Sequence, residues 1–445
     1  MLYPNVSKGE LAPVRLLSQL ILHPFCQKTQ GRFLQTDRFN STFVSIVSGM
    51  APVSRELSSS SPAGVTTTRP ASPRLMCLDI FRGLCVAGMI VVDNPGSDDK
   101  AYWPIMHAEW NGWTPADLIF PSFLFLVGIS VVFSLSSRLQ RGQSRSQILV
   151  HTLWRTLILI AIGFLVNASP IVGFDIHTFR FEGVTQRIAL CYLFAVVLEL
   201  WSGRREQLIA FAACVIGYWA ILRFVPVPGY GLPGRDIPFM DPDRNLAAWL
   251  DRKLFMGHLY NKTRDPEGLL HTIPAIGTTL AGVLTGHWLR SMKSSAAKAW
   301  GMLLIGIVSL SAGLLWNRWF PINKNLWTSS FVLFTAGVAL VFLAFLYWLL
   351  EIRRWRGAWT MPVLVFGMNS IIAFVADSVV YGPGYSFTAK GPSGASMSWH
   401  EVAQAYLESF GLSTPAASLI YSLAALSFCW ILLWLLWRKR VFIKV

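Results

Sequence analysis

Ten apolar runs of membrane-spanning length follow one another from residue 76 onward. Each is close to the roughly 20 residues that a helix needs to cross the hydrocarbon core of a bilayer. A segment in lipid must satisfy its own backbone hydrogen bonds, which favours helices for runs of this length. Only 14% of the residues are charged, against about 25% in soluble domains, so an ordinary soluble enzyme is excluded. The sequence predicts an all-α, polytopic transmembrane bundle of about ten spans, at 77–94, 115–137, 147–169, 183–201, 206–225, 269–290, 298–316, 326–350, 358–380 and 416–437.

Basic residues gather in every second loop of this predicted bundle. The loops after the second, fourth, sixth and eighth runs are short and rich in Lys and Arg, and so is the C-terminal tail. One other loop, 317–325, also carries base without acid. Lys and Arg collect on the cytoplasmic side of membrane proteins, so both termini are predicted to be cytoplasmic, with 95–114 and 226–268 outside. The net charge of +15 then reflects the bilayer as partner, and no nucleic-acid partner is expected. The residues behind the orientation are Arg138, Arg141, Arg145, Arg204, Arg205, Arg290, Lys293, Lys298, Arg353, Arg354, Arg356, Arg438, Lys439, Arg440 and Lys444.

The first 74 residues differ in composition from the rest of the chain. They are rich in Ser, Thr, Pro and Arg, and 58–73 is of low complexity. Such a segment buries too little apolar surface to offset its ordering entropy. We expect a disordered tail over 1–74, with Met50 and Met76 as alternative starts, and a membrane domain over 75–445. The six cysteines are scattered without a CxxC motif, which predicts buried free thiols.

Polar residues inside the runs form two layers. Ionisable groups in a membrane are costly, so each is a candidate for function, although interhelical hydrogen bonding is the alternative for each alone. The outer layer contains His107, Trp110 and Asn111 of the first outer loop together with Asp93, Asn94, Asp117, Gln186, Arg187, His271, Asn323, Lys324, Asn325, Asn369 and Asp377. The inner layer contains Asp79, Arg82, His151, Arg155, His287 and Arg290.

The two layers suit different chemistry. A histidine with carboxylates suits general acid–base work on a hydroxyl or amine, and Asp117 is a candidate to orient His107. The inner basic groups suit a phosphate-bearing cytoplasmic ligand. No group of residues has the spacing of a metal site, so none is predicted.

Six blocks carry a resemblance to a known family. They are LDIFRGLCVAGMIVVDNPG (78–96), HAEWNGWTPADLIFPSFLFLVGIS (107–130), GVTQRIALCY (183–192), DPEGLLHTIPAIGTTLAGVLTG (265–286), PINKNLWTSSFVLFTAG (321–337) and GMNS (367–370). In this order they resemble the heparan-α-glucosaminide N-acetyltransferase family, including its bacterial members, over roughly 76–445.

This resemblance implies transmembrane acetylation. Acetyl-coenzyme A would be supplied from the cytoplasm, and the acetyl group would reach an amino sugar on the far side. The catalytic histidine of the family corresponds to His107, and a family asparagine corresponds to Asp93 by direct matching, with Asn94 beside it. Family members can be dimers, so a homodimer is a further expectation, and a bacterial inner membrane is the expected location.

Residue roles follow from combining the topology with the resemblance. His107 is expected to act as general base or as transient acyl carrier, and these alternatives remain open. Asp117 would orient it, and Asn94 or Asp93 would hold the thioester carbonyl or the acceptor. The rival hypotheses are a transporter or flippase for a glycan or lipid-linked substrate without acyl transfer, and a structural or regulatory membrane component. The residues expected to bind the acceptor are Trp110, Asn111, Gln186, Arg187, His271, Asn325 and Asn369. Those expected to bind coenzyme A are Arg82, Arg155, His287 and Arg290.

Overall fold

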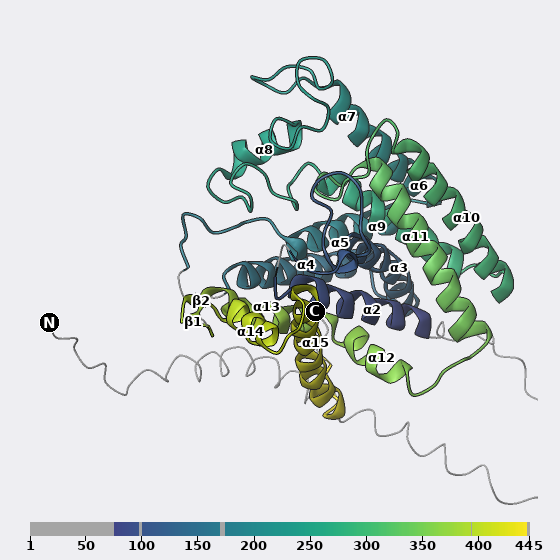
Figure 1. The fold of residues 1–445 in the computed structure, drawn as a ribbon. Coiled ribbons are helices and arrows are strands. Elements are labelled where there is room, and N and C mark those ends of the chain that lie inside the picture. Colours follow the sequence, from purple (N-terminus) through teal and green to yellow (C-terminus); the bar gives the residue numbers. More distant parts are fainter. Residues whose placement is uncertain (1–74, 98–99, 170–173, 393, 443–445) are drawn as a thin grey trace, which may run out of the picture. The chain divides into compact units, whose positions relative to one another are not determined.

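A computed structural model describes residues 75–97, 100–169, 174–392 and 394–442, and the tail predicted over 1–74 lies outside them. The described chain is built from helices, with one small antiparallel hairpin of β1 (Thr388–Lys390) and β2 (Ser396–Ser398), in which Ala389 pairs with Met397 (Figure 1). The helices are α2 (Met76–Asp93), α3 (Ile119–Gln140), α4 (Arg145–Asn167), α5 (Val184–Trp201), α6 (Arg204–Ala212), α7 (Tyr218–Phe224), α8 (Leu246–Phe255), α9 (Thr272–Leu289), α10 (Ser295–Trp316), α11 (Ser329–Tyr347), α12 (Thr360–Met368), α13 (Ser370–Ser386), α14 (Trp399–Ser409) and α15 (Thr414–Arg438).

Every one of the ten apolar runs is helical, which confirms the predicted helical membrane bundle. Seven helical segments of the described chain are long and apolar enough to cross a membrane, and an eighth span is formed if the bent pair α12–α13 counts as one. The ten-span count stays a prediction, because α2 and α9 fall below that standard. The seven segments are Pro115–Gln140, Arg145–Asn167, Val184–Trp201, Arg204–Phe224, Ser295–Trp316, Ser329–Ile352 and Thr414–Arg438.

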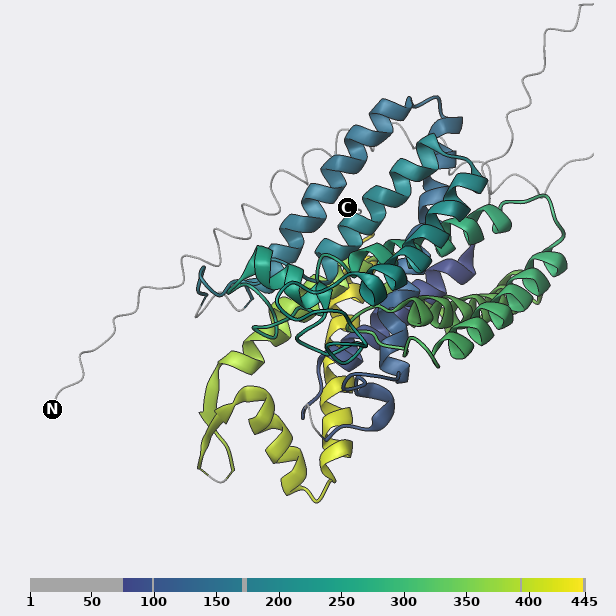
Figure 2. The same cartoon turned by 90° about the horizontal axis from the view of Figure 1, so that it is seen from above.

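The two polar helices, α2 and α9, lie inside the bundle. α9 is rich in Gly and Thr, and thirteen of its eighteen residues are buried against α3, α5, α6 and α11. The apolar helix α10, by contrast, buries only three of its twenty-two residues and packs on α11 at one flank (Figures 1 and 2). Polar side chains in lipid must face protein, which accounts for the buried places of α2 and α9, although the very apolar helices α3 and α11 are central as well.

The ninth run, 358–380, is not one straight span. It is broken at Asn369, where α12 and α13 meet at 81°. Asn369 has φ −126° and ψ 40°, outside the helical region, so the helical hydrogen-bond ladder stops there. Its side-chain Nδ2 donates to the carbonyl of Val441 at 3.4 Å. Sharp bends of this kind need a local cause, and here it is the non-helical conformation of Asn369.

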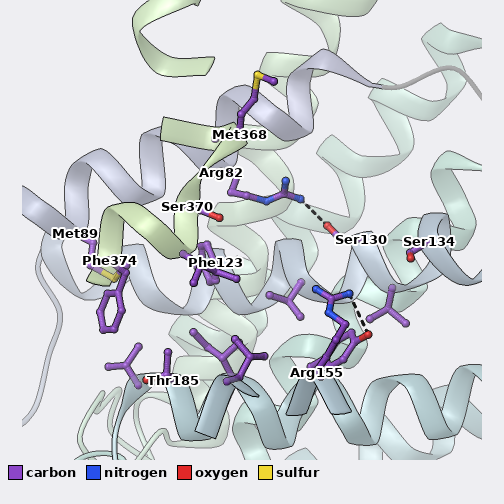
Figure 3. A pocket seen from close by; sticks show the side chains of 18 of the residues that line it. Arg82, Met89, Phe123, Ser130, Ser134, Arg155, Thr185, Met368, Ser370 and Phe374 are labelled. Carbon is purple, nitrogen blue, oxygen red and sulfur yellow. Dashed lines mark hydrogen bonds between the residues drawn. The ribbon is translucent and has the colours of Figure 1, made fainter. Parts of the chain in front are cut away.

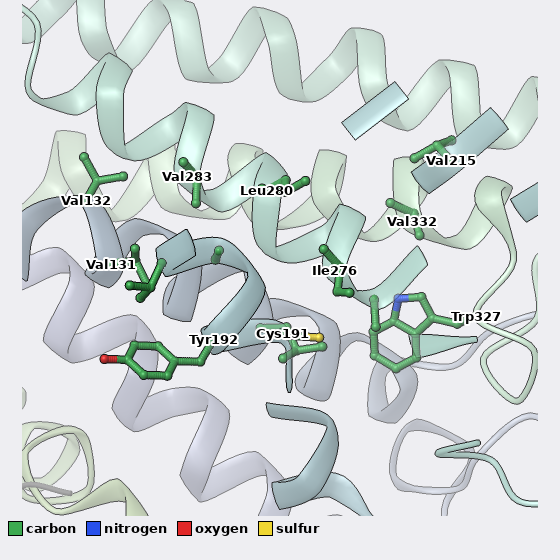
Figure 4. Packing of buried hydrophobic residues seen from close by; sticks show 14 of the residues in the cluster. Val131, Val132, Cys191, Tyr192, Val215, Ile276, Leu280, Val283, Trp327 and Val332 are labelled. Carbon is green, nitrogen blue, oxygen red and sulfur yellow. The ribbon is translucent and has the colours of Figure 1, made fainter. Parts of the chain in front are cut away.

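Trp327 anchors the loop before α11 to the core. Its indole is 1% exposed and lies among the apolar side chains of α3, α5 and α9 (Figure 4). Its Nε1 donates to Thr278 Oγ1 at 3.0 Å, and Phe120 meets the ring edge-on. Trp327 has φ +48°, a conformation that costs a bulky residue energy, so tertiary packing maintains it. The anchor holds the preceding loop over the bundle.

α3 and α9 cross at backbone contact. A Cβ atom at Gly282 would collide with the carbonyl of Phe125, and one at Gly128 would collide with the carbonyl of Thr279. Small residues at such crossings let helix backbones approach closely, which is a main source of helix association in lipid. The crossing brings α9 against the helix that carries Asp117 at its entrance.

We predict that Gly282→Ala destabilises the protein, because the added methyl group has no space between the two backbones. Overpacking of this kind costs about 1–3 kcal/mol. Thermal unfolding of the detergent-solubilised protein measures the loss. Gly217→Ala is the matched control, since a Cβ there meets nothing within 4 Å. Equal melting temperatures for the two variants would contradict the tight crossing.

Candidate active site

Two cavities lie end to end in the bundle. The first, here called the His107 cavity, has a volume of about 290 Å³. The second, here called the arginine cavity, has a volume of about 470 Å³. The polar side chains that line the His107 cavity are Asp93, His107, Arg180, Tyr260, Asn261, Glu267, Lys324 and Asn325. Those that line the arginine cavity are Arg82, Ser130, Ser134, Arg138, His151, Arg155, Thr185, Tyr192 and Ser370.

The two cavities meet at Met89 and Val184, which line both. Helix α3 contributes residues to both linings, from Ile119 in the His107 cavity to Arg138 in the arginine cavity. Nineteen residues of α-helix rise about 29 Å, close to the roughly 30 Å thickness of the hydrocarbon core. Together the two cavities therefore extend along about the length of one membrane-spanning helix, and their two ends differ in chemistry.

The arginine cavity presents guanidinium groups held by hydroxyl partners. Figure 3 shows Arg82 of α2 and Arg155 of α4 pointing into the same space. Arg82 donates to Ser130 Oγ at 2.7 Å and pairs with Asp79 at 3.5 Å, whereas Arg155 donates to the hydroxyl of Tyr192 at 3.3 Å. The guanidinium of Arg155 also lies 4.9 Å from the ring centre of Tyr192. Neutral partners leave the positive charge of Arg155 available to an anion.

His107 and Asp117 form a hydrogen-bonded pair in the His107 cavity. His107 Nδ1 lies 2.8 Å from Asp117 Oδ1, and the side chains are 43% and 1% exposed. A carboxylate acceptor places the imidazole proton on Nδ1 and leaves the lone pair of the neutral ring on Nε2. The Lys324 ammonium lies 3.1 Å from Nδ1, 3.2 Å from Nε2 and 3.5 Å from Asp117 Oδ1. The predicted orienting role of Asp117 has the geometry it needs.

Local sequence fixes Asp117 in this position. Thr114-Pro115-Ala116-Asp117 starts the second span with a capping box, in which Asp117 accepts from the backbone N–H of Thr114 at 3.0 Å. The N–H of Ala108 donates to the same Oδ2 atom at 3.1 Å. A reciprocal cap of this type satisfies donors that a helix start leaves open. One oxygen is thus held by backbone, and the other faces His107.

Lys324 and Asn325 reach the cavity from a loop that is itself rigid. Asn323, which is fully buried, accepts from the N–H of Leu326 at 2.8 Å and donates to Asn111 Oδ1 at 3.3 Å. With Trp327 in the core, both ends of the short loop are fixed. The predicted acceptor residue Asn325 lines the cavity, while Asn111 supports it from outside.

The structure separates Asp93 from Asn94. Asp93 lines the His107 cavity and is exposed there. Asn94 is 2% exposed, donates to Asp377 Oδ1 at 2.6 Å and to the carbonyl of Ile90 at 2.8 Å, and lines neither cavity. Consecutive helical positions point about 100° apart, so only one of the two can face a given space. Asp93 is the one that faces His107's cavity.

An ion-pair cluster backs the opposite wall of the His107 cavity. Arg180 donates to both oxygens of Asp265, at 2.7 Å and 2.5 Å, and pairs with Glu267. Burial alone would raise the pKa of Asp265, but the hydrogen bonds and charge of Arg180 hold it below its ordinary value. Burial, with the charges of Asp251 and Asp265, raises the pKa of Glu182 to about 9. The wall is therefore assembled by buried electrostatics.

Several residues that were predicted to bind the acceptor substrate instead support this wall from within the protein. Arg187 is 1% exposed and donates to the carbonyl of Pro266 at 3.0 Å. His271 Nε2 bonds the carbonyl of Asp265 at 3.0 Å. Gln186 packs against Gly163 of α4, and Trp110 donates to the carbonyl of Met240 at 3.0 Å. None of these residues lines either large cavity, and Asn369 stands at the α12–α13 break.

The predicted donor residues divide in the same way. Arg82 and Arg155 line the arginine cavity. His287 bonds Glu199 Oε2 at 2.9 Å, and Arg290 caps the end of α9, so both lie outside the cavity lining. The sequence predicts no binding role for several residues that line the cavities. In the arginine cavity these are Ser130, Ser134, Arg138 and His151, and in the His107 cavity they are Arg180, Tyr260, Asn261, Glu267 and Lys324. His151 and Lys324 are placed in the inner and outer layers by their depth, and this depth is the sequence signal that could have identified them.

In the described part of the chain, no three His, Cys, Asp or Glu side chains are placed to hold a metal ion. The five cysteines that the structure describes are free thiols; four are buried, as predicted, while Cys214 is half-buried, and Cys26 lies outside the described residues. The buried four are Cys77, Cys85, Cys191 and Cys429.

We predict that Asp251→Asn flattens the pH dependence of stability. Burial raises the pKa of Asp251 to about 7, against about 3.9 in an unfolded chain. The folded state thus holds the proton more tightly, so stability falls as pH rises from about 4 to 7. The variant loses this decline and melts higher than wild type above pH 7. Melting curves at stepped pH test it, with the exposed Glu109→Gln as control. If the melting temperature of Asp251→Asn falls with pH as steeply as that of wild type, a protonated Asp251 in the folded state is refuted.

Comparison with known proteins agrees with this geometry. Residues 74–316, more than half of the chain, match the model of the family described as heparan-alpha-glucosaminide N-acetyltransferase, catalytic. Two curated relatives carry the name heparan-alpha-glucosaminide N-acetyltransferase. The Mus musculus protein is 32% identical over 368 residues, covering 71% of this chain and 55% of the relative. The Homo sapiens protein is 33% identical over 359 residues, covering 69% and 53%.

The chain thus spans about half the length of the curated relatives it matches. The matched region runs from α2 to α10 and includes Asp93, His107, Asp117 and Arg155. The resemblance drawn from six sequence blocks is confirmed, and the chain belongs to the heparan-alpha-glucosaminide N-acetyltransferase family.

Proposed function

We propose that this protein is a transmembrane acetyltransferase that moves an acetyl group from cytoplasmic acetyl-coenzyme A to an extracytoplasmic amino sugar or related glycan. One observation carries the proposal: two cavities of opposite character meet end to end at Met89 and Val184. One has arginines for a phosphate-bearing donor. The other has a His–carboxylate pair for an acceptor. Family membership supports the acyl-transfer chemistry.

The donor would enter through the arginine cavity. Arg82, Arg138 and Arg155 line it, and guanidinium groups bind phosphate oxygens with charge-assisted hydrogen bonds. The long, thin arm of coenzyme A would extend along α3 toward Met89. The thioester then reaches the junction, where the acetyl carbon faces the His107 cavity. This arrangement keeps the nucleotide end of the donor on the side that the charge pattern assigns to the cytoplasm.

His107 would act on the acceptor. Its Nε2 lone pair takes the proton from the attacking amine, and Asp117 stabilises the imidazolium that forms. The C–N bond forms, the C–S bond breaks, and the imidazolium returns its proton to the leaving thiolate. Lys324, close to Nε2, is placed to stabilise negative charge on the acetyl oxygen. Transfer through an acetyl-histidine uses the same groups in two steps.

The topology belongs to the same proposal. Ten spans with cytoplasmic termini put 138–146 inside and 95–114 outside, as the loop charges indicate. A bacterial inner membrane and a homodimer complete the proposed setting. A flippase without acyl transfer is the second function to be tested, because two joined cavities also suit a passage. The two are distinguished by whether acetyl-coenzyme A is consumed.

We predict that the purified protein transfers radiolabelled acetyl from acetyl-coenzyme A to glucosamine, and that His107→Ala lowers the rate by about 10²- to 10⁴-fold. Donor binding should change little, because His107 lies outside the arginine cavity. Asp117→Asn should cause a smaller loss. His177→Ala, at an exposed loop histidine, is the control with wild-type rate.

Label retained on wild-type protein without acceptor would indicate the acyl-histidine route, and its absence would indicate direct transfer. A His107→Ala variant with wild-type activity would remove His107 from the mechanism. Glycan movement across proteoliposomes without consumption of acetyl-coenzyme A would favour the flippase.

We predict that Arg155→Ala weakens acetyl-coenzyme A binding by about 10- to 100-fold, the worth of one charge-assisted contact. Arg290→Ala is a matched control, because Arg290 is near the same predicted membrane face but outside the cavity lining. Titration calorimetry on detergent-solubilised protein measures both. Equal weakening in the two variants would point to general charge attraction and against a built donor site.

A further inference from the structure

A cluster of titratable side chains lies behind the loop 258–268, which contributes one wall of the His107 cavity. Arg180 pairs with both Asp265 and Glu267, so one guanidinium serves two carboxyls. Arg187 is the second arginine, and two further carboxyls lie around it. If all four carboxyls were ionised, negative charge would exceed positive charge away from water, which is costly. The cluster consists of Glu182, Asp251, Asp265, Glu267, Arg180, Arg187 and His271, with Tyr218 and the half-buried Arg252 near Asp251.

Several buried polar atoms of this cluster have no hydrogen-bond partner among the described residues. They are Oε2 of Glu182, Oδ2 of Asp251, Nδ1 of His271, and Nε and Nη1 of Arg187. His271 donates from Nε2 to the carbonyl of Asp265 at 3.0 Å, so Nδ1 of the neutral ring is an acceptor. Buried polar groups nearly always have partners. Three acceptors without a donor indicate that protons on the carboxyls complete the cluster.

Glu182 and Asp251 are the carboxyls that hold these protons. Arg187 and Arg180 favour the ionised form of Glu182, but burial and the charges of Asp251 and Asp265 outweigh them and raise its pKa to about 9. For Asp251, burial together with the charge of Asp265 raises the pKa to about 7, against the opposing effects of its backbone hydrogen bond and of the neighbouring arginines. Charge balance and unpartnered atoms therefore point to the same two groups.

The same cluster fixes the backbone of the loop. Arg187 donates to the carbonyls of Pro266 at 3.0 Å and Gly268 at 3.4 Å, and Asp251 accepts from the N–H of Leu269 at 3.1 Å. A Cβ atom at Gly268 would collide with Asp251 Oδ2, so the loop lies directly on this carboxyl. A negative charge that appears there acts on the backbone that forms the cavity wall.

We infer that Glu182 and Asp251 form a proton-binding site that keeps the 258–268 wall of the His107 cavity in its described, closed conformation. Loss of the protons adds negative charge beside Asp265, and the loop then opens. Tyr260, Asn261 and Glu267 leave the cavity lining with it. The effect on acceptor binding rests on the proposed function, whereas the proton site itself does not.

The pH range of this control follows from the two carboxyls. An open loop exposes both to water, where their pKa values return to about 4, while the closed loop holds them at about 7 and about 9. The closed form therefore binds more protons, and it loses ground to the open form as pH rises. Each group contributes up to about tenfold per pH unit. Both act between about pH 4 and 7, and Glu182 acts alone between about pH 7 and 9.

Hydrogen–deuterium exchange of the full chain in detergent tests the site, with rates corrected for the pH dependence of intrinsic exchange. We expect protection of wild-type peptides from 258–269 to fall by up to about tenfold per pH unit between about pH 7 and 9. Glu182→Gln should keep protection level over that range. Asp251→Asn should reduce the decline below about pH 7 and retain the decline above it. Glu109→Gln, which removes an exposed carboxylate, is the matched control and should follow wild type.

Acetyl transfer to glucosamine measures the consequence for the acceptor. The KM of wild type for glucosamine, divided by that of Glu182→Gln at the same pH, should rise between about pH 7 and 9, while the ratio of kcat values stays level. Comparison at equal pH cancels the titration of the amine and of His107. If a variant does not fold, the wild-type exchange decides, because the decline should occur in 258–269 and not in α10.

Each outcome bears on a separate statement. Level protection of the wild-type wall across this pH range, or a decline that both variants retain in full, would overturn the inference. If exchange behaves as expected but acetyl is never transferred, the proposed function fails and the proton site stands. If acetyl is transferred but the KM ratio stays constant, the function stands and control of the acceptor by this wall is refuted.

Discussion

The cost of exposing a polar group to hydrocarbon determines how this bundle is arranged. α2 and α9 carry polar and small residues that lipid would disfavour, and both are buried among other helices. Close approach at Gly128 and Gly282 then fixes α9 against α3. Because α3 begins with the capping box of Asp117, the same packing that shields polar residues also fixes the carboxylate beside His107. Scaffold and site are thus consequences of one solvation constraint.

The candidate site consists of side chains that line the two cavities and side chains that support them. His107, Asp93 and Lys324 face one cavity, and Arg82 and Arg155 face the other. Behind them, Arg180 with Asp265, Arg187 with the 266–268 backbone, and Asn94 with Asp377 are buried and bonded within the protein. Most buried polar groups in proteins have hydrogen-bond partners. Arg187 has them only in part, because its Nε and Nη1 atoms have no partner among the described residues. Burial with partners within the protein distinguishes these supporting residues from those that line a cavity.

Much of the organisation is predictable from the amino-acid sequence. Apolar run length indicates the long apolar helices, though not α8 and α14, and loop charge indicates an orientation. The pairing of His107 with Asp117 is predictable because both lie in one short block, where the chain between them limits their separation. Depth alone predicts an inner basic layer that includes Arg82, Arg155, His287 and Arg290, and of these Arg82 and Arg155 line the arginine cavity. The break at Asn369 is not expected, since a single polar residue among apolar ones gives no signal of an 81° bend.

What the sequence determined by itself is the depth of each residue along its helix, since rise per residue is constant. What only the tertiary structure decided is the direction each side chain faces. Asp93 and Asn94 have nearly the same depth, yet one faces a cavity and the other a buried carboxyl. Arg155 and Arg290 share the basic layer, yet only Arg155 lines the arginine cavity. The direction in which a side chain points depends on which helices pack together, and this packing is set by contacts between segments far apart in the chain.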